Sequence, residues 1–443
     1  MTHTPQPLLS HQSGPLSGDV TPPGDKSISH RAVMLGGIAE GTTTVRGLLE
    51  GEDVLCTIAA LKVLGATVTR EADVWRIVGT GLAGLKEPSG FLDMGNSGTA
   101  ARLLIGLLAG RNFTSFFTGD ASLRKRPMGR VITPLEPMGA QFVSRAGGKL
   151  PLAVTGAAMP QPVVYRLPVA SAQVKSAVLF AGLSASGITT VIESAPTRDH
   201  SERMLRHFGA TVTVAPTPDG AEAISVTGQP RLVGQSIIVP ADISSAAFPM
   251  VAAALRLGSK VTLRNVGTNP RRDGLIRTLL EMGAKITLGN PREQSGEPVA
   301  DLTIEGGVLK GITVPAARAP SMIDEYPVLA MAAACAEGTS RLCGLGELRV
   351  KESDRLALVA DGLKACGAAV VIEGDDLIIH GNGQPPQGGA TVETAMDHRI
   401  AMSFLVLGTA TPKPVRIDDG SFIATSFPCF VALMNGLGAN IRP

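Results

Sequence analysis

An apolar residue followed by Gly-Ala recurs six times along the chain. The six copies begin at Leu64, Met138, Phe208, Met282, Cys366 and Leu437. Their spacing of roughly 70–84 residues is longer than the repeat of a solenoid. An amphipathic stretch typical of a helix precedes each copy and a β-rich run follows it, so the glycine closes a helix in the left-handed conformation. The sequence therefore predicts six similar α/β units.

Each predicted unit opens with a polar patch and a long apolar helix, followed by a strand, a second helix and two further strands. A chain of 443 residues is too long for one ordinary core, so the six units divide three and three. We expect an α/β fold with two similar domains, each of three βαβαββ units. One domain covers residues 25–241, and the other combines residues 1–24 with residues 242–443. The hinge lies near Gly24 and near Pro240-Ala241-Asp242.

The composition excludes several classes of partner. A formal net charge of +2 gives no basic surface for nucleic acid and no reason to expect a membrane surface. The five cysteines are scattered and lack metal-ligand spacing, which is typical of buried thiols in a reducing compartment. The N-terminal stretch lacks an apolar signal region, and no apolar run reaches membrane-spanning length. We therefore expect a cytoplasmic protein that binds no metal, nucleic acid or membrane.

The first helix is predicted to begin within residues 23–31, where Lys26, His30 and Arg31 crowd its first turn. A cation there is unfavourable by roughly 0.3–1 kcal/mol, because a helix N-terminus carries partial positive charge. Such crowding is understandable if an anion lies among the cations and the free backbone N–H groups. A solvated surface cluster is the alternative, and for a single site the two interpretations are equally good.

Cations recur at the openings of later units. Arg102, Lys175 and Arg399 occupy similar places, whereas the fifth opening carries the acid Asp324. The fourth opening, residues 242–245, has neither a cation nor obvious chemistry. If the first helices of each domain run alike, their N-termini converge on one face, and two such faces form an anion-binding cleft.

Two further segments are dense in charge. Residues 125–130 form either an exposed basic turn or a fixed loop, with Pro and Gly among the cations. In residues 350–356, Lys351 and Arg355 are spaced i,i+4 and Glu352 and Arg355 i,i+3, so all three share one face at a helix start. This pattern is typical both of a surface ion-pair network and of a carboxylate tuned for proton transfer. The motifs of serine hydrolases, zinc proteases, Walker ATPases and Rossmann dinucleotide sites are absent from the sequence.

At these motifs the sequence resembles the 5-enolpyruvylshikimate-3-phosphate synthase family, also called 3-phosphoshikimate 1-carboxyvinyltransferase, over nearly its whole length. The matching motifs lie, in order, at residues 23–31, 92–99, 125–128, 349–355 and 397–399. The resemblance implies the enolpyruvyl transferase fold, an inside-out α/β barrel in two domains with the active site in the interdomain cleft. It also implies a monomer that transfers the enolpyruvyl group of phosphoenolpyruvate to the 5-hydroxyl of shikimate 3-phosphate, without a metal or organic cofactor. This shikimate pathway reaction serves aromatic amino acid biosynthesis and is the target of glyphosate.

The resemblance also implies roles for individual residues. Asp324 resembles the proton-accepting acid, and Lys26 and Glu352 are the candidates for moving protons at the substrate's carbon. The residues implied to contact shikimate 3-phosphate are Lys26, Ser27, Arg31, Ser171, Ala172, Gln173, Arg198, Asp324 and Lys351. The residues implied to contact phosphoenolpyruvate are Lys26, Gly98, Arg126, Gln173, Arg355 and Arg399. Two phosphorylated carboxylates require several fixed cations, and this set supplies them.

Two positions depart from part of the family. Thr425 stands where many members carry a lysine that contacts phosphoenolpyruvate, and Arg198 begins a segment where others carry a tyrosine. Both features resemble the bacterial subgroup called class II, which contains glyphosate-tolerant enzymes. The related UDP-N-acetylglucosamine enolpyruvyl transferases use a reactive cysteine, but residues 125–128 fill that loop here without a cysteine nearby. A non-catalytic repeat protein that binds anions would need neither Asp324 nor Glu352.

Overall fold

The structure, a computed structural model, describes residues 4–443 and divides into two compact units. Unit 1 comprises the N-terminal segment up to Asp25, then Pro240–Glu293 and Pro298–Pro443. Unit 2 comprises Lys26–Val239 and the short segment Gln294–Glu297. The chain therefore passes between the units four times, and two of these passages flank the short segment.

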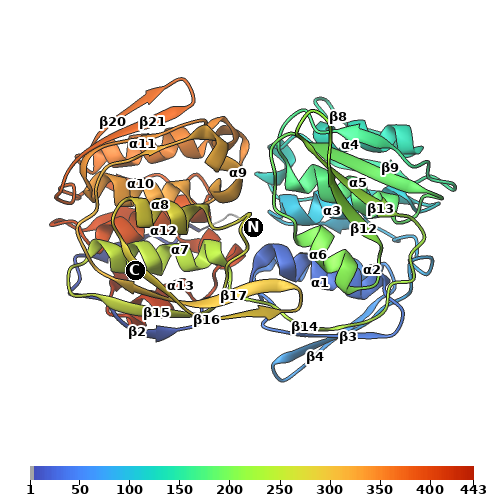
Figure 1. Cartoon of the computed structure of the whole chain (residues 1–443), viewed down its shortest axis with the longest axis horizontal. Helices are drawn as coiled ribbons and strands as arrows, with labels where there is room; N and C mark the ends of the chain where they lie inside the picture. The colour runs from blue at the N-terminus through green and yellow to red at the C-terminus, as the bar shows by residue number, and fades with distance from the viewer. Residues whose placement is uncertain (1–3) are drawn as a thin grey trace. The chain divides into compact units, whose positions relative to one another are not determined.

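Helices and short strands alternate along unit 2 (Figure 1). Its helices are α1 (Lys26–Ile38), α2 (Glu52–Val63), α3 (Gly98–Ala109), α4 (Gly129–Leu135), α5 (Ala172–Gly182) and α6 (His200–His207), with 3₁₀ turns at Leu123–Lys125 and Glu136–Met138. Its strands are β3 (Thr42–Arg46), β4 (Thr67–Glu71), β5 (Val74–Val78), β6 (Phe91–Asp93), β7 (Thr114–Thr118), β8 (Gln141–Arg145), β9 (Lys149–Thr155), β10 (Val164–Arg166), β11 (Ile188–Glu193), β12 (Val212–Pro216), β13 (Glu222–Thr227) and β14 (Ser236–Ile238).

Unit 1 follows the same alternation. Its helices are α7 (Ile243–Leu255), α8 (Gly274–Glu281), α9 (Ala319–Met322), α10 (Tyr326–Cys335), α11 (Arg355–Ala365), α12 (His398–Gly408) and α13 (Phe430–Gly436), with 3₁₀ turns at Ala316–Arg318, Gly346–Val350 and Ser421–Thr425. Its strands are β1 (Leu8–His11), β2 (Ser17–Val20), β15 (Lys260–Gly267), β16 (Lys285–Gln294), β17 (Glu297–Glu305), β18 (Thr313–Val314), β19 (Glu337–Leu342), β20 (Ala369–Glu373), β21 (Asp376–Asn382), β22 (Thr391–Val392), β23 (Val415–Ile417) and β24 (Asn440–Arg442).

The strands form six four-stranded sheets of one topology. Unit 2 holds β14-β3-β5-β4, β6-β7-β9-β8 and β10-β11-β13-β12, and unit 1 holds β2-β15-β17-β16, β18-β19-β21-β20 and β22-β23-β1-β24. In each sheet the first strand is parallel to the second, and the second is antiparallel to the third. One parallel crossover followed by antiparallel strands is what a βαβαββ unit produces, so the six predicted units are present.

Two strands are exchanged where the chain joins the units. Strand β2 directly precedes α1 of unit 2, yet it pairs with β15 of unit 1. Strand β14 directly precedes α7 of unit 1, yet it pairs with β3 of unit 2. Strand β1 also lies in unit 1, between β23 and β24. The N-terminal segment thus packs with the C-terminal half of the chain.

The glycine of each Gly-Ala repeat has the left-handed conformation that the sequence predicts. The φ angles are 107° at Gly65, 101° at Gly139, 102° at Gly209, 91° at Gly283, 90° at Gly367 and 105° at Gly438. A residue with a Cβ is strained at such angles, so glycine marks the place where each helix ends and the next strand begins.

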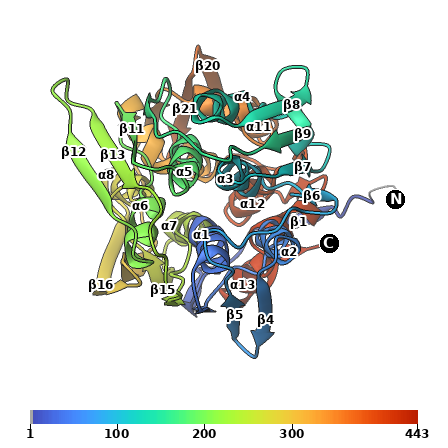
Figure 2. The same ribbon diagram turned by 90° about the vertical axis from the view of Figure 1, so that its right-hand side faces the viewer.

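The core of each unit surrounds its three long apolar helices. In unit 2, Figure 2 shows α1, α3 and α5 nearly end-on, with hairpins of the three sheets around them. Close packing requires glycine at one point, because a Cβ on Gly106 of α3 would lie 2.3 Å from the carbonyl oxygen of Ala177 in α5. In unit 1, α7, α10 and α12 contact one another in the same way. No helix within residues 4–443 is long and apolar enough to cross a membrane.

Candidate functional site

The first turns of the three central helices of unit 2 meet one another. His30 of α1 lies 3.4 Å from Ser97 Oγ at the start of α3. Gln173 of α5 donates to Thr99 Oγ1 at 2.9 Å and accepts from Arg102 Nη1 at 2.6 Å, and both partners belong to α3. The N-termini of α1, α3 and α5 therefore converge, as the repeated polar openings predict.

Serine side chains cap the N-termini of two of these helices, α3 and α5. Ser97 Oγ accepts from the backbone N–H of Ala100 at 3.1 Å, and Ser171 Oγ accepts from that of Val174 at 3.4 Å. A neutral cap leaves the positive end of the helix dipole uncompensated. This end of α3 and α5 therefore favours a bound anion.

Lys26 and Ser27 form the first turn of α1, and both are half-buried. Lys26 Nζ lies 2.9 Å from Asp53 Oδ2, with the lysine side chain 16% exposed. The carbonyl of Ser27 accepts from Arg31 Nη1 at 2.9 Å. The ammonium group of Lys26 is thus held in place while part of the lysine side chain remains accessible.

Arg31, one turn further along α1, is buried and fixed by hydroxyl groups. Its Nε donates to Ser201 Oγ and its Nη2 donates to Ser176 Oγ, both at 2.8 Å. The two serine hydroxyls are 2.7 Å apart and belong to α6 and α5. The guanidinium group therefore ties the first turn of α1 to two other helices.

Gly98 lies against two guanidinium groups. A Cβ at this position would lie 3.0 Å from both Arg102 Nη1 and Arg126 Nη1. Arg126 is buried and donates from Nη2 to Asn96 Oδ1 at 2.8 Å and to Ser122 Oγ at 3.3 Å. The structure thus brings together Gly98 and Arg126, which the family resemblance assigns to the same ligand.

Lys175, the cation at the third opening, does not contribute to an anion-binding face as the recurring cations predict. Its side chain is completely buried, with Nζ 3.0 Å from Glu193 and 2.7 Å from Glu202. Two buried carboxylates require a buried cation, so this charge neutralises them inside the unit.

Arg198, another predicted site residue of unit 2, is half-buried in the loop between β11 and α6, where it remains accessible.

Unit 1 gathers its predicted site residues around Arg355, the first residue of α11, whose side chain is only 1% exposed. Its Nη1 lies 3.2 Å from Asp324 Oδ1 and its Nη2 lies 2.6 Å from Glu352 Oε2. The neighbouring Lys351 Nζ lies 3.4 Å from the same Asp324 oxygen, and Arg399 Nη1 donates to the backbone carbonyl of Asp324 at 3.2 Å. All five residues that the resemblance places in this half of the chain are therefore close together.

Asp397 is a member of this cluster that the predicted site residues do not include. It caps α12 by accepting from the backbone N–H of Arg399 at 2.9 Å, and its Oδ2 lies 2.8 Å from Arg355 Nε. Burial disfavours the charge of Arg355, but the carboxylates of Asp397, Glu352 and Asp324 outweigh it and raise the pKa of Arg355. An acid directly before the apolar run of a helix is the sequence signal for such a cap.

The fourth opening, where the sequence shows no cation, receives one from a distant loop. Asp242 caps α7, and the buried Arg272 lies 3.7 Å from it, 3.7 Å from Asp25 and 3.6 Å from Glu325. Burial, together with the Asp25 carboxylate, raises the pKa of Asp242 to about 6, although Arg272 opposes the shift. In residues 4–443, no group of three or more His, Cys, Asp or Glu side chains is arranged to hold a metal ion.

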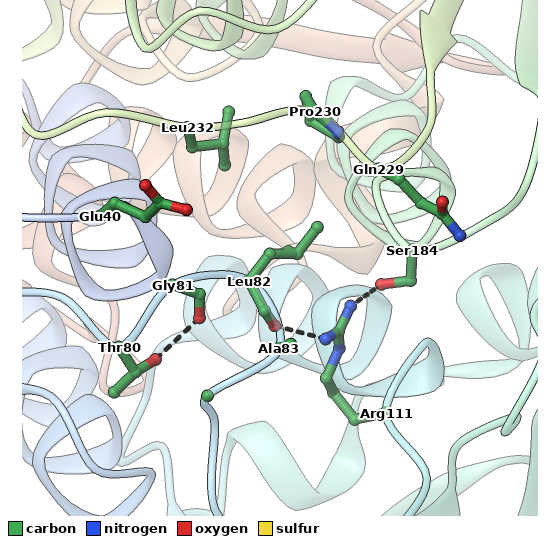
Figure 3. A pocket seen from close by; sticks show the side chains of 11 residues that line it. Glu40, Thr80, Gly81, Leu82, Ala83, Arg111, Ser184, Gln229, Pro230 and Leu232 are labelled. Carbon is green, nitrogen blue, oxygen red and sulfur yellow. Dashed lines mark hydrogen bonds between the residues drawn. The ribbon is translucent and has the colours of Figure 1, made fainter.

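A pocket of about 500 Å³ lies at the opposite ends of the central helices of unit 2 (Figure 3). Glu40, Arg111 and Ser184 line it, each two residues beyond the end of α1, α3 or α5. Arg111 donates to the carbonyl of Leu82 and to Ser184 Oγ, and burial lowers its pKa. A cation at helix C-termini complements their negative dipole ends. None of the predicted site residues lines this pocket.

Comparison with known proteins identifies the chain's relatives. A family model described as EPSP synthase (3-phosphoshikimate 1-carboxyvinyltransferase) matches residues 10–434. A protein named 3-phosphoshikimate 1-carboxyvinyltransferase from Paramagnetospirillum magneticum is 63% identical over 437 residues, which are 98% of each chain. A protein of the same name from Rhodospirillum rubrum is 61% identical over 442 residues, 99% of this chain and 98% of the relative.

Solved structures agree with the sequence relatives. The EPSP synthase of Acinetobacter baumannii superposes with a TM-score of 0.87 at 47% identity, covering 99% of this chain and 100% of that one. The enolpyruvyl transferase NikO of Streptomyces tendae gives a TM-score of 0.76 at 17% identity over 99% of each chain, which shows a shared fold. The predicted enolpyruvyl transferase fold is confirmed, and the chain belongs to the EPSP synthase family.

Proposed function

We propose that this protein transfers the enolpyruvyl group of phosphoenolpyruvate to the 5-hydroxyl of shikimate 3-phosphate. The products are 5-enolpyruvylshikimate 3-phosphate and phosphate, and the reaction belongs to the shikimate pathway of aromatic amino acid biosynthesis. The observation that carries the proposal is the family match over residues 10–434, in a chain whose predicted site residues lie together within each unit. A fold alone would not be sufficient, because unrelated activities share folds.

The proposed substrate contacts divide between the units. In unit 2 the shikimate 3-phosphate ligands are Lys26, Ser27, Arg31, Ser171, Ala172, Gln173 and Arg198, and the phosphoenolpyruvate ligands are Lys26, Gly98, Arg126 and Gln173. In unit 1 the corresponding ligands are Asp324 and Lys351 for the first substrate, and Arg355 and Arg399 for the second. The convergence of three helix N-termini with fixed cations supports the anion-binding role of unit 2.

Proton transfer is assigned to Asp324, Glu352 and Lys26. In the addition step the 5-hydroxyl oxygen attacks the central carbon of phosphoenolpyruvate, Asp324 accepts the hydroxyl proton, and a proton is delivered to the methylene carbon. In the elimination step the methyl carbon formed in this way loses a proton and phosphate departs from the adjacent carbon, which restores the carbon–carbon double bond and gives the enol ether product. Two cations lie within 3.4 Å of Asp324 Oδ1, an arrangement that favours the ionised form a base requires.

The remaining features of the proposal are a monomer, a cytoplasmic location and sensitivity to glyphosate at the phosphoenolpyruvate site. All five cysteines are free, which agrees with a reducing compartment. Gly98 has no Cβ that would lie against Arg126, a proposed ligand of phosphoenolpyruvate, which agrees with access for an inhibitor at that point. Light scattering after size-exclusion chromatography would test the monomer.

Phosphate release on mixing the two substrates tests the proposed function. We expect release only when both phosphoenolpyruvate and shikimate 3-phosphate are present, and no dependence on added metal. Replacing shikimate 3-phosphate with shikimate removes the phosphate that the unit 2 cations are proposed to bind, and should abolish turnover. A protein that binds both compounds without releasing phosphate would instead be an anion-binding module.

A further inference from the structure

The turn between β16 and β17 makes its contacts within unit 2. Ser295 and Gly296 have φ angles of 51° and 82°, the pair of left-handed residues that a two-residue hairpin turn favours. Ser295 Oγ accepts from the backbone N–H of Ile238 at 2.9 Å, and Gln294 Nε2 donates to the Ile238 carbonyl at 3.2 Å. The hairpin tip, Gln294–Glu297, is therefore attached to the last strand of unit 2.

Glu297, which follows the turn, is buried against His200. Its Oε1 lies 2.7 Å from His200 Nδ1, and the two side chains are 3% and 2% exposed. A carboxylate this deeply buried is costly unless a fixed partner compensates it. Because His200 is the first residue of α6, the hairpin tip fixes the place where this helix begins.

Arg203 provides a second attachment of the tip to the first turn of α6. Its Nη1 donates to the carbonyl of Gly296 at 3.0 Å, and its Nε donates to Asp199 Oδ2 at 2.9 Å. The tip thus holds the helix start through both a side chain and its own backbone. Residues 199–203 are therefore linked to the tip by these contacts.

Thr197, the residue before Arg198, is held in place by contacts that do not involve the hairpin tip. Its backbone N–H and its Oγ1 donate to the carboxylate of Glu193, at 3.2 and 2.6 Å. Glu193 is in turn paired with the buried Lys175 at 3.0 Å. Arg198 therefore lies directly between two anchored positions, one set by Glu193 and the other by Glu297.

We infer that Glu297 is a positioning residue for Arg198, the proposed ligand of shikimate 3-phosphate. The inference rests on the proposed function and deepens it by naming a residue that determines affinity for one substrate. Glu297 fixes His200, His200 fixes the start of α6, and that start sets the direction from which the Arg198 guanidinium reaches its ligand. Glu297 itself touches no substrate. Its removal lowers the affinity for shikimate 3-phosphate but leaves the rate of the chemical step unchanged.

Steady-state kinetics of Glu297→Ala test the inference. The KM for shikimate 3-phosphate should rise roughly tenfold, equivalent to most of one charged hydrogen bond. The KM for phosphoenolpyruvate and kcat should stay within about twofold, because the lost contact orients only one ligand. Glu297→Gln keeps an acceptor for His200 and should recover most of the affinity. Glu293→Gln, an exposed acid of the same hairpin, is the matched control and should behave as the wild type.

A double-mutant cycle distinguishes positioning from general destabilisation. If Glu297 acts through Arg198, then Glu297→Ala should add little to the KM for shikimate 3-phosphate once Arg198→Ala is present. Additive effects of the two substitutions would overturn the inference. Equal rises in both KM values would also overturn it, because they would indicate damage to the whole site.

Hydrogen exchange without substrates separates failure of this inference from failure of the proposed function. A wild-type protein that releases no phosphate overturns the proposed function, yet the exchange comparison still applies. Faster exchange over residues 197–203 in Glu297→Ala than in Glu293→Gln supports the inference, because amides released from a fixed helix start open more often. Equal exchange in the two variants overturns it.

Discussion

The two units begin their central helices with opposite chemistry on one repeated fold. In unit 2, serines cap α3 and α5, and Arg31 donates to the hydroxyls of Ser176 and Ser201. In unit 1, Asp242 caps α7 and Asp397 caps α12, and buried arginines lie beside these acids. A serine leaves the positive helix end available to an anion, whereas an aspartate neutralises it and favours a cation nearby. The comparison teaches that a repeated scaffold can present different charges at corresponding helix ends by changing its capping residues.

The largest expected effect comes from Asp324→Asn in unit 1. The amide keeps the shape of the carboxylate but accepts no proton, so kcat should fall by roughly 10²–10⁴-fold, as is typical of general acid–base groups. Binding of shikimate 3-phosphate, measured by calorimetry, should largely survive because the unit 2 cations are intact. Near-normal turnover would remove Asp324 from the mechanism. A loss confined to binding would show that Asp324 acts as a ligand and not as a base.

Asp397→Asn tests whether the buried charges of unit 1 stabilise it. Asparagine can still cap α12, but Arg355 loses one of its carboxylate partners, so we expect a loss of about 2–3 kcal/mol in the free energy of unfolding. Asp354→Asn is the matched control, because Asp354 caps α11 with its side chain 41% exposed. That substitution should change stability by no more than about 0.5 kcal/mol. Urea unfolding followed by circular dichroism provides both values, and equal losses would refute the argument.

The acid at the start of α7 predicts a dependence of stability on pH. Because the pKa of Asp242 is raised to about 6 in the folded protein, the unfolded chain releases this proton more easily, and this group lowers stability as pH rises from about 4 to 6. Asp242→Asn lacks that loss. The stability of the variant relative to the wild type should therefore increase by about 1–3 kcal/mol between pH 4.5 and 7.5. A difference that is constant over this range would contradict a raised pKa.

The sequence predicts those parts of the molecule whose signal is local. Glycine before each strand indicates where helices end, because only glycine adopts the left-handed conformation without strain, and all six positions were confirmed. The spacing around Arg355 likewise predicts its contact with Glu352, which is confirmed. The predicted helix face shared with Lys351 and Glu352 is wrong, because α11 begins only at Arg355 and both residues precede it. In each case the groups that do interact are close in the chain.

Contacts between distant segments could not be predicted in this way. Lys175 occupies the same place in its unit as Arg102 does. Its partners Glu193 and Glu202 become its neighbours only when β11 and α6 pack against α5. Arg272, which lies 3.7 Å from Asp242 at the start of α7, comes from a loop that contains no recognisable motif. Glu297 and His200 are 97 residues apart, and their pairing depends on where a hairpin tip lies.

The smallest expected effect comes from Gly98→Ala, which changes the unit 2 face by one methyl group. The added carbon would lie 3.0 Å from the ends of the Arg102 and Arg126 side chains, and such flexible ends can move by a few tenths of an ångström. The cost should therefore fall at the low end of overpacking, about 1 kcal/mol, or roughly a fivefold weaker interaction at the phosphoenolpyruvate site. Glyphosate is longer than phosphoenolpyruvate, so its inhibition constant should rise more than the KM for phosphoenolpyruvate does. The KM for shikimate 3-phosphate should change least, because its proposed ligand Gln173 meets the methyl group only through Arg102. If the ratio of the glyphosate inhibition constant to the KM for phosphoenolpyruvate is the same in both variants, Gly98 does not face the inhibitor.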